Sequence, residues 1–542
     1  MRINYGKIFS HRETVQSAPI PGSNQIANSA GGYAWQINDW ARLDRFLVLG
    51  SEGGSYYASE RALTIDNADV VMRCLSADGP RTVGQVVEVS RAGRAPKNGP
   101  AIFALAMAAK LGDPETRKLA YAAVPQVCRI GTHLMHFAEY AQAFGGWGRG
   151  MRRAVGNWYN ERPVERLAYQ LLKYQARDGW SNRDLLRLAH PKAPTDAHHQ
   201  LYRWATKGTW SGSDERGLAL IGAFERAKQA TRVEEIIELI RAHGSPREAI
   251  PTKWLVHPGV WDALLVEMPM TAMIRNLATM TRVGLLTSMS EATRTVLARL
   301  GDGERLRKAR IHPVAVLAAL MTYRAGRGAR GNHTWQPIGR LVDALDSAFY
   351  KSFDAVEATG RRTLLGLDVS GSMACGQIAG VPGLTPRVAS AAMALITANV
   401  EDNYGFVAFT GGNWSSKTPS VRKSLRELDI TPRMRLDDVL RRVERLPFGA
   451  TDCALPMLWA LEKKLVVETF VIYTDSETWV GHIHPTQALQ KYRREMGIAA
   501  KLIVVGMVSN GFTIADPQDQ GMLDVVGFDT ATPAVMSDFS RA

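Results

Sequence analysis

The feature that most constrains the fold is a change in the spacing of apolar residues near residue 360. Before it, apolar residues recur at helical intervals, as in VEEIIELIRAHG, which ends at Gly244. After it, helical segments alternate with short β-rich runs, namely TLLGLDVS, YGFVAFT, TFVIYTD and AKLIVVGM. Nearly continuous apolar strands separated by helices are typical of an open, parallel α/β sheet. We therefore predict a mostly α-helical chain, with a helical domain at residues 1–359 and an α/β domain at residues 360–542.

Local signals in the first domain indicate many short helices. Asp113 and Pro114 stand where an N-cap and a first helical residue are expected. Ser181 and Asp184 have the spacing of a capping box, and Pro191 halts the helix that follows them. Such helices recur without a fixed sequence period, which predicts an irregular helical-repeat array.

The net positive charge of the chain comes from the predicted helical domain. The formal net charge is +14, whereas residues 361–542 hold 19 basic and 19 acidic residues. The excess therefore lies entirely in residues 1–360, which favours a polyanion-binding part joined to a neutral part. Four cysteines without CxxC spacing, no apolar run of about 18 residues and no signal peptide lead us to expect a cytoplasmic protein without a membrane span.

Five oxygen-bearing side chains fall where a ligand site is expected in an open α/β sheet, at the carboxyl ends of strands. They are Asp368, Ser370, Ser372, Thr451 and Asp475. Hard oxygen ligands with two negative charges suit Mg²⁺ or a similar divalent cation, bound directly or through water. The set resembles the metal-ion-dependent adhesion site of von Willebrand factor A domains. That resemblance implies a non-catalytic metal whose open position accepts an acidic group from a protein partner.

Other interpretations of these residues are weaker. Ser370 and Ser372 could simply cap a helix after a strand. A nucleophilic aspartate of the phosphatase type would need a second Asp at the position of Ser370, and neither G-x-S-x-G nor a P-loop occurs here. His482 and His484 lack further ligands nearby in sequence, so we expect them to be structural.

A second candidate site is a basic stretch in the helical domain. Lys173 and Arg177 are four residues apart, which predicts a shared helix face. Arg183 and Arg187 repeat this spacing on the next helix, and His190 ends it. A stripe of cations on neighbouring helices can neutralise several phosphates. The alternative is a solvated charged face with no ligand.

Several longer segments resemble the sixty-kilodalton Ro autoantigen family. They include GGYAWQINDWARLDRFLVLGSEGGSYY, VCRIGTHLMHF, GWGRGMRRAVGNWYNE, KYQARDGWSNRDLLRLAH, KARIHPVAVLAALMTY and NGFTIADPQDQGMLD. The resemblance, to a bacterial-type member, runs from about residue 25 to the C-terminus. It implies a HEAT-like helical-repeat ring, the TROVE domain, followed by a von Willebrand factor A domain. The chain departs from animal members in a shortened stretch before GGWGRG and in GTHLMHF, which replaces a proline-containing version.

The resemblance also implies a function. Y-like small noncoding RNA would bind the outer ring surface, with contacts matching Lys173, Arg177 and His190, and single-stranded ends of misfolded RNA would enter the ring hole. A Y RNA could tether the exoribonuclease polynucleotide phosphorylase. We therefore expect a ribonucleoprotein scaffold for noncoding-RNA quality control, not an enzyme. The alternative is a metal-dependent hydrolase of RNA or phosphate esters using Asp368 and Asp475, although a nuclease would usually gather more carboxylates.

Overall fold

The computed structural model describes residues 13–52, 55, 58–210, 218–309, 311–328, 332–352, 358–378, 381, 383–411, 424–446, 449–529 and 531–542. The chain forms two compact units, one of Ala68–Phe353 and one of Met1–Asn67 with Asp354–Ala542. This division differs from the predicted boundary at its N-terminal side. The described residues before 68, which the sequence pattern places in the helical domain, pack with the α/β unit.

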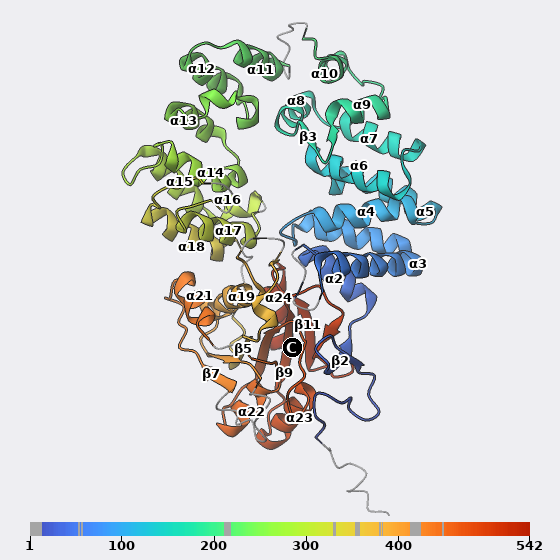
Figure 1. Ribbon diagram of the computed structural model, residues 1–542, viewed down its shortest axis with the longest axis vertical. Helices are drawn as coiled ribbons and strands as arrows, with labels where there is room; N and C mark the ends of the chain where they lie inside the picture. Colours follow the sequence, from blue (N-terminus) through green and yellow to red (C-terminus); the bar gives the residue numbers. More distant parts are fainter. Residues whose placement is uncertain are drawn as a thin grey trace, which may run out of the picture. The chain divides into compact units, whose positions relative to one another are not determined.

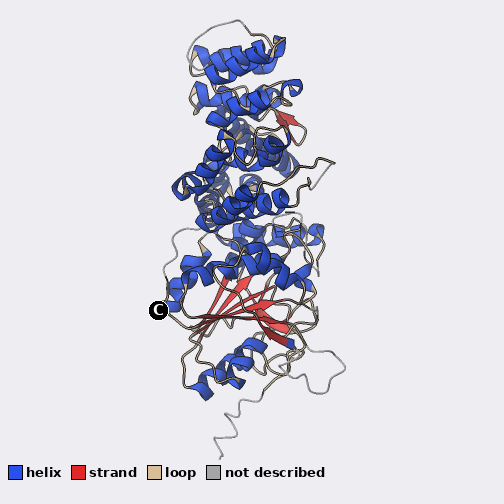
Figure 2. Cartoon of the chain, turned by 90° about the vertical axis from the view of Figure 1, so that its left-hand side faces the viewer, coloured by secondary structure: helices blue, strands red, loops and turns tan. Residues whose placement is uncertain are grey.

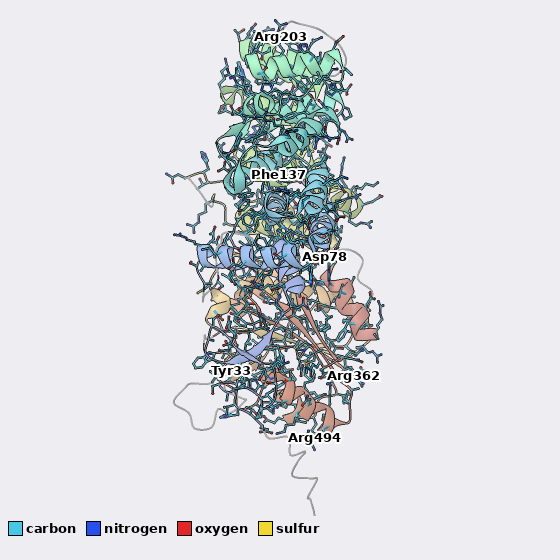
Figure 3. All side chains as sticks on the ribbon, turned by 90° about the vertical axis from the view of Figure 1, so that its right-hand side faces the viewer. Tyr33, Asp78, Phe137, Arg203, Arg362 and Arg494 are labelled. Atoms are coloured by element: carbon cyan, nitrogen blue, oxygen red, sulfur yellow. The ribbon has the colours of Figure 1, made fainter. Side chains whose placement is uncertain are left out.

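The helical unit contains the following elements. They are α3 (Glu60–Ala92), α4 (Gly99–Leu111), α5 (Pro114–Val127), α6 (Gly131–Gly145), α7 (Arg149–Asn160), α8 (Val164–Lys173), β3 (Ala176–Arg177), β4 (Trp180–Ser181), α9 (Asn182–Ala189), α10 (Asp196–Lys207), α11 (Ala219–Gln229), α12 (Val233–His243), η1 (Arg247–Ala249), η2 (Thr252–Trp254), α13 (Pro258–Glu267), α14 (Met270–Arg282), α15 (Glu291–Gly301), α16 (Gly303–Lys308), α17 (Pro313–Arg324) and α18 (Gly339–Lys351). The division between the units falls inside α3, and Asp78 marks a break in that helix just before Pro80 (Figure 3).

Each helix packs mainly on its near neighbours in sequence, as a helical-repeat array requires (Figure 1). The predicted helix starts are confirmed. The Asp113 carboxylate accepts a 2.7 Å hydrogen bond from the Thr116 amide, and Ser181 and Asp184 form a reciprocal capping box. The apolar faces point inward, with Ile236 and Ile240 of α12 buried.

The end of the helical unit returns to its beginning. The His312 ring, just before α17, hydrogen-bonds through Nε2 to the carbonyl oxygen of Arg94, just after α3, at 2.9 Å. His312 is 6% exposed, so this contact lies in a packed interface. The series of packed helices thus closes on itself within the unit, in agreement with the predicted ring.

The α/β unit is built on one six-stranded sheet with the order β11-β9-β8-β5-β6-β7 (Figure 1). Its strands are β5 (Thr363–Asp368), β6 (Tyr404–Phe409), β7 (Leu425–Glu427), β8 (Thr469–Thr474), β9 (Lys501–Gly506) and β11 (Met522–Val526). All neighbours are parallel except β7, which pairs antiparallel with β6. The four β-rich runs recognised in the sequence are β5, β6, β8 and β9, so the predicted parallel sheet is confirmed.

Helices cover both faces of this sheet (Figure 2). They are η3 (Ser372–Ala374), α19 (Pro386–Val400), α21 (Leu436–Glu444), α22 (Leu455–Glu462), α23 (Pro485–Met496) and α24 (Thr532–Arg541). Alternate residues of each strand face opposite layers: Leu364 and Phe470 pack in the core under α22 and α23. Val471 lines the opposite face, with residues of α19 and α24.

The N-terminal segment adds a second, small sheet to the α/β unit. Strands β1 (Ile26–Ala27) and β2 (Tyr33–Gln36) pair antiparallel, and β2 also pairs with β10 (Phe512–Thr513). Figure 3 marks Tyr33 at the start of β2. Helix α2 (Asp39–Leu49) follows and packs on β11. Among the described residues, no helix has both the length and the apolar character that crossing a bilayer requires.

Candidate metal centre and nucleic-acid interface

The two predicted metal-binding aspartates lie side by side at one edge of the sheet. Asp368 is the last residue of β5, and Asp475 directly follows β8. These strands are parallel neighbours, with Leu367 opposite Tyr473, so their carboxyl ends meet. The apolar sequence of each strand buries its end, and Asp368 and Asp475 are 0% and 4% exposed.

Hydrogen bonds fix the loop after β5 around these carboxylates. Asp368 accepts from the Ser370 amide at 2.9 Å through Oδ1 and from the Thr474 hydroxyl at 2.7 Å through Oδ2. The Ser370 and Ser372 hydroxyl oxygens are 3.1 Å apart, and Ser372 also hydrogen-bonds to Asp475. The structure therefore brings four of the five predicted residues together through their side chains.

Thr451 joins this group through the backbone of its loop. The Gly371 amide donates to the Gly449 carbonyl at 3.2 Å, which ties the loop to the one that carries the serines. The Thr451 carbonyl accepts from the Trp479 amide at 3.1 Å, which ties it to the loop after Asp475. Thr451 is 1% exposed. All three loops of the predicted site are thus held against one another.

The electrostatics of this group favour a cation. Burial raises the pKa of Asp368. Burial, the charge of Asp368 and the charge of Glu477 raise the pKa of Asp475 to about 8. Neither aspartate forms an ion pair with a Lys, Arg or His in the described part of the chain. Two ionised carboxylates side by side in such a site are stabilised by a divalent cation.

A buried arginine supports the loop from beneath. The Arg387 guanidinium of α19 donates to the carbonyl oxygens of Val369 and Ser370, the latter at 3.1 Å. Its charge lowers the pKa of Asp368, although burial has the larger effect and the net shift is upward. Arg387 therefore holds the backbone of the loop that carries Ser370 and Ser372.

The donor set fits a hard divalent cation and no soft metal. It offers two carboxylates and three hydroxyls, and oxygen ligands of this kind suit Mg²⁺. No group of three or more His, Cys, Asp or Glu side chains in the described ranges is placed to hold a metal. A metal at this edge would therefore depend on the Ser370, Ser372 and Thr451 hydroxyls as well as on the acids.

The predicted helix face shared by Lys173 and Arg177 is wrong. Helix α8 ends at Lys173, and Arg177 lies on strand β3 of a two-stranded hairpin, paired with Trp180. Asp178 and Gly179 form the turn with φ of 51° and 79°. An Asp-Gly pair is the preferred turn of a two-residue hairpin because both positions need positive φ. That signal was present in the sequence and was missed.

The cations after the hairpin lie as predicted. Arg183 and Arg187 are exposed on α9, one turn apart, and His190 is its exposed C-cap. Arg177 is also exposed, at 58%, and its Nε lies 3.4 Å from the Asp178 carboxylate. The predicted stripe is thus a hairpin tip followed by a helix face. Its role in binding stays a prediction.

Lys173 has different surroundings. Its Nζ donates to the Tyr169 hydroxyl at 3.1 Å and lies 5.2 Å from the centre of the Tyr169 ring. It lines a cavity of about 890 Å³ between α8, α11, α12, α13 and α14. Burial opposes the charge of Lys173, but the neighbouring tyrosines and Glu248 raise its pKa overall. The lysine is therefore a half-buried cation held beside aromatic rings.

His484 is structural, as expected. Its Nε2–H donates to the Ala18 carbonyl at 2.8 Å, and Nδ1 accepts from the Gln25 side chain at 3.3 Å. Burial lowers the pKa of His484, so the ring stays neutral. His482 is exposed. The histidine thus anchors the N-terminal segment, which sequence reasoning had not associated with this unit.

Comparison with known proteins places the chain in a family. The TROVE domain family matches residues 26–322, and the Ro60 vWA domain family matches residues 362–540. The RNA-binding protein RO60 of Deinococcus radiodurans is 43% identical over 519 residues, which cover 95% of each chain. This chain belongs to the Ro60 family. The resemblance seen in the sequence is therefore confirmed.

Other relatives of this Ro60 family member agree. The RNA-binding protein RO60 of Caenorhabditis elegans is 37% identical over 593 residues, covering 95% of this chain and 90% of that protein. The crystal structure of the Deinococcus radiodurans RO (RSR) protein matches with a TM-score of 0.70 and 43% identity, covering 93% of this chain and 99% of that chain. The predicted fold, a helical TROVE domain followed by an α/β vWA domain, is confirmed.

Proposed function

We propose that this Ro60 family member is an RNA-binding scaffold. The observation that carries the proposal is the group of exposed Arg and His side chains on the hairpin and α9, namely Arg177, Arg183, Arg187 and His190. It lies in the part of the chain that holds the whole net charge of +14. Both relatives described above bear the name RNA-binding protein. Exposed Arg and His side chains on neighbouring elements can contact the phosphates of a structured, Y-like small RNA.

A second RNA element would engage the helical unit separately. The His312–Arg94 contact, which closes the series of helices, supports a ring whose hole takes single-stranded ends of misfolded RNA. The half-buried Lys173 lies beside the Tyr169 ring. Proteins that bind single-stranded nucleic acid combine a cation with an aromatic ring in this way. A scaffold of this kind would act in noncoding-RNA quality control in the cytoplasm, with an exoribonuclease such as polynucleotide phosphorylase tethered through the bound RNA.

The vWA domain would add a metal-dependent protein contact. Asp368, Ser370, Ser372, Thr451 and Asp475 would hold Mg²⁺, which supplies an electrophilic position for an acidic group of a partner protein. Hydrolysis of RNA or phosphate esters at this edge is the alternative function. The site brings together two aspartates as acid ligands, whereas a two-metal hydrolase needs carboxylates for both ions. The donor set therefore favours adhesion over catalysis.

One purification separates these functions. The protein is isolated from its native source, its bound RNA is sequenced, and the same RNA is incubated with the protein and Mg²⁺. The scaffold predicts an elevated 260/280 absorbance ratio, an enriched small RNA and intact RNA after incubation. Cleavage of the RNA that is lost in Asp475→Ala would establish the hydrolase and contradict the scaffold.

A further inference from the structure

The N-terminal strap, defined as residues 13–36, is bound across the loops of the candidate metal centre. Gln16 is 0% exposed, and its Nε2 donates to the Asp452 carboxylate at 2.7 Å and to the Ile483 carbonyl at 2.8 Å. Its Oε1 accepts from the Thr478 hydroxyl. One side chain thus joins the residue after Thr451 to the loop after Asp475.

The backbone of the strap adds to this junction. The Gln16 amide donates to the Gly481 carbonyl at 2.9 Å, and the Asn28 side chain donates to the Thr478 carbonyl at 2.8 Å. The amides of Ser29 and Ala30 donate to the Glu477 carboxylate at 2.8 and 3.2 Å. Residues two to six positions after Asp475 are therefore held by a segment more than 440 residues away.

Two glycines allow this close approach. A Cβ added at Gly481 would lie less than 3.0 Å from the side-chain nitrogen Nε2 of Gln16 and from the Asp452 carboxylate. A Cβ added at Gly32 would lie less than 3.0 Å from the Thr478 carbonyl. The strap and the loop therefore pack so closely that neither glycine leaves room for a side chain, and a shift of one segment displaces the other.

Helix α2 reaches the same loops from another direction. Arg45 is 1% exposed and donates to both carboxylate oxygens of Asp524 at 2.6 and 2.7 Å. It also donates to the Asn510 side chain at 3.2 Å, and Asn510 in turn donates to the Asp475 carbonyl at 2.7 Å. The N-terminal segment therefore supports Asp475 through two separate hydrogen-bonded paths.

We propose that Gln16 is a positioning residue for the metal centre and that the docked strap sets the affinity of this centre for Mg²⁺. The inference rests on the metal site of the proposed function. Gln16 holds the Thr451 and Asp475 loops at a fixed separation, and ligand orientation by such outer partners governs metal affinity. Linkage requires the reverse effect as well: Mg²⁺ stabilises the docked strap by the same factor by which docking strengthens Mg²⁺ binding.

The full-length protein tests this coupling. Mg²⁺ affinity is measured by calorimetry for the wild type, Gln16→Ala, Gln16→Asn and Asp368→Ala. Gln16→Asn keeps the amide but shortens its reach. Ser23→Ala is the matched control, because the hydrogen bonds of the Ser23 hydroxyl to described residues stay within the strap, to Ile20 and Gln25. Hydrogen exchange of the strap amides, with and without Mg²⁺, gives a readout independent of calorimetry.

We expect both Gln16 variants to weaken Mg²⁺ binding by about 10-fold to about 100-fold, and Ser23→Ala to leave it unchanged. Mg²⁺ should slow exchange at the Ser29 and Ala30 amides in the wild type and have less effect in Gln16→Ala. Wild-type Mg²⁺ affinity in both Gln16 variants would overturn the inference and leave the metal site standing. A wild-type protein that binds Mg²⁺ no better than Asp368→Ala would overturn both.

Discussion

His312 and Arg94 are joined by a 2.9 Å hydrogen bond although 218 residues separate them in the sequence. The contact links the start of α17 to the end of α3 and so closes the series of packed helices. The His312 Nδ1 also accepts from the Val314 amide at 3.2 Å, which caps α17. The His312 ring therefore caps α17 through Nδ1 and closes the helical unit through Nε2.

Loss of this imidazole should loosen the closure. His312→Ala removes the side-chain hydrogen bonds to the Arg94 carbonyl and from the Val314 amide, which we expect to cost about 1–3 kcal/mol. Hydrogen exchange should increase in α17 and at the end of α3. The control is His199→Ala, at an exposed position of α10. Equal protection of α17 in both variants would show that the contact does not close the unit.

The close approach of the strap should make Gly32 intolerant of a side chain. Gly32→Ala places its Cβ against the Thr478 carbonyl, and we expect a loss of about 1–3 kcal/mol from the α/β unit. Gly339→Ala provides the control, since a Cβ there meets no atom within 4 Å. Thermal unfolding compares the two. A Gly32→Ala protein as stable as Gly339→Ala would contradict the packing described for the strap.

The raised pKa of Asp475 predicts how stability depends on pH. Its folded pKa of about 8 lies above the unfolded value of about 3.9, so the folded state binds the proton more tightly. Without divalent cations, the α/β unit should therefore lose stability as the pH rises from about 4 to about 8. Mg²⁺ competes with the proton, so it should raise the melting temperature more at pH 8 than at pH 6. A shift that is equal at both pH values, or that persists unchanged in Asp475→Asn, would contradict this assignment.

The hairpin that presents Arg177 depends on its turn. Gly179→Ala forces a side chain into a φ of 79°, at a cost of about 1–2 kcal/mol. We expect faster exchange at residues 176–181 and weaker RNA binding, without unfolding of the helical unit. Gly148→Ala is the control, because Gly148 has a φ of −113° and open space for a Cβ. Unchanged RNA affinity in Gly179→Ala would remove the hairpin from the interface.

Helix-capping residues and the ends of buried parallel strands were the signals that predicted structure correctly. The Ser181–Asp184 box and the Asp113 cap are local hydrogen bonds, so the sequence shows them directly. Asp368 and Asp475 were found because each ends a buried parallel strand, and such ends meet at one edge. The prediction that Lys173 and Arg177 share a helix face is wrong because the Asp178–Gly179 turn places Arg177 on a strand, and a four-residue spacing alone does not show this.

The strap could not have been predicted in this way. Strands β1 and β2 have two and four residues, too few to show a period. The contacts of Gln16 join residues 436 to 467 positions apart, and a polar side chain gives no sequence signal of such a partner. Only the folded structure reveals that the metal loops and the N-terminal segment form one hydrogen-bonded unit.

The most direct test of the account is the salt dependence of RNA binding. Affinity for the co-purified RNA is measured from low to moderate salt for the wild type, for Arg177→Ala/Arg187→Ala and for the charge-matched control Arg294→Ala/Lys308→Ala, whose cations are 65% and 75% exposed elsewhere in the helical unit. We expect the first pair to weaken binding and to reduce the slope of log affinity against log salt by up to about two. The control should keep the wild-type slope. Identical affinity and slope in all three proteins would contradict the proposed RNA interface.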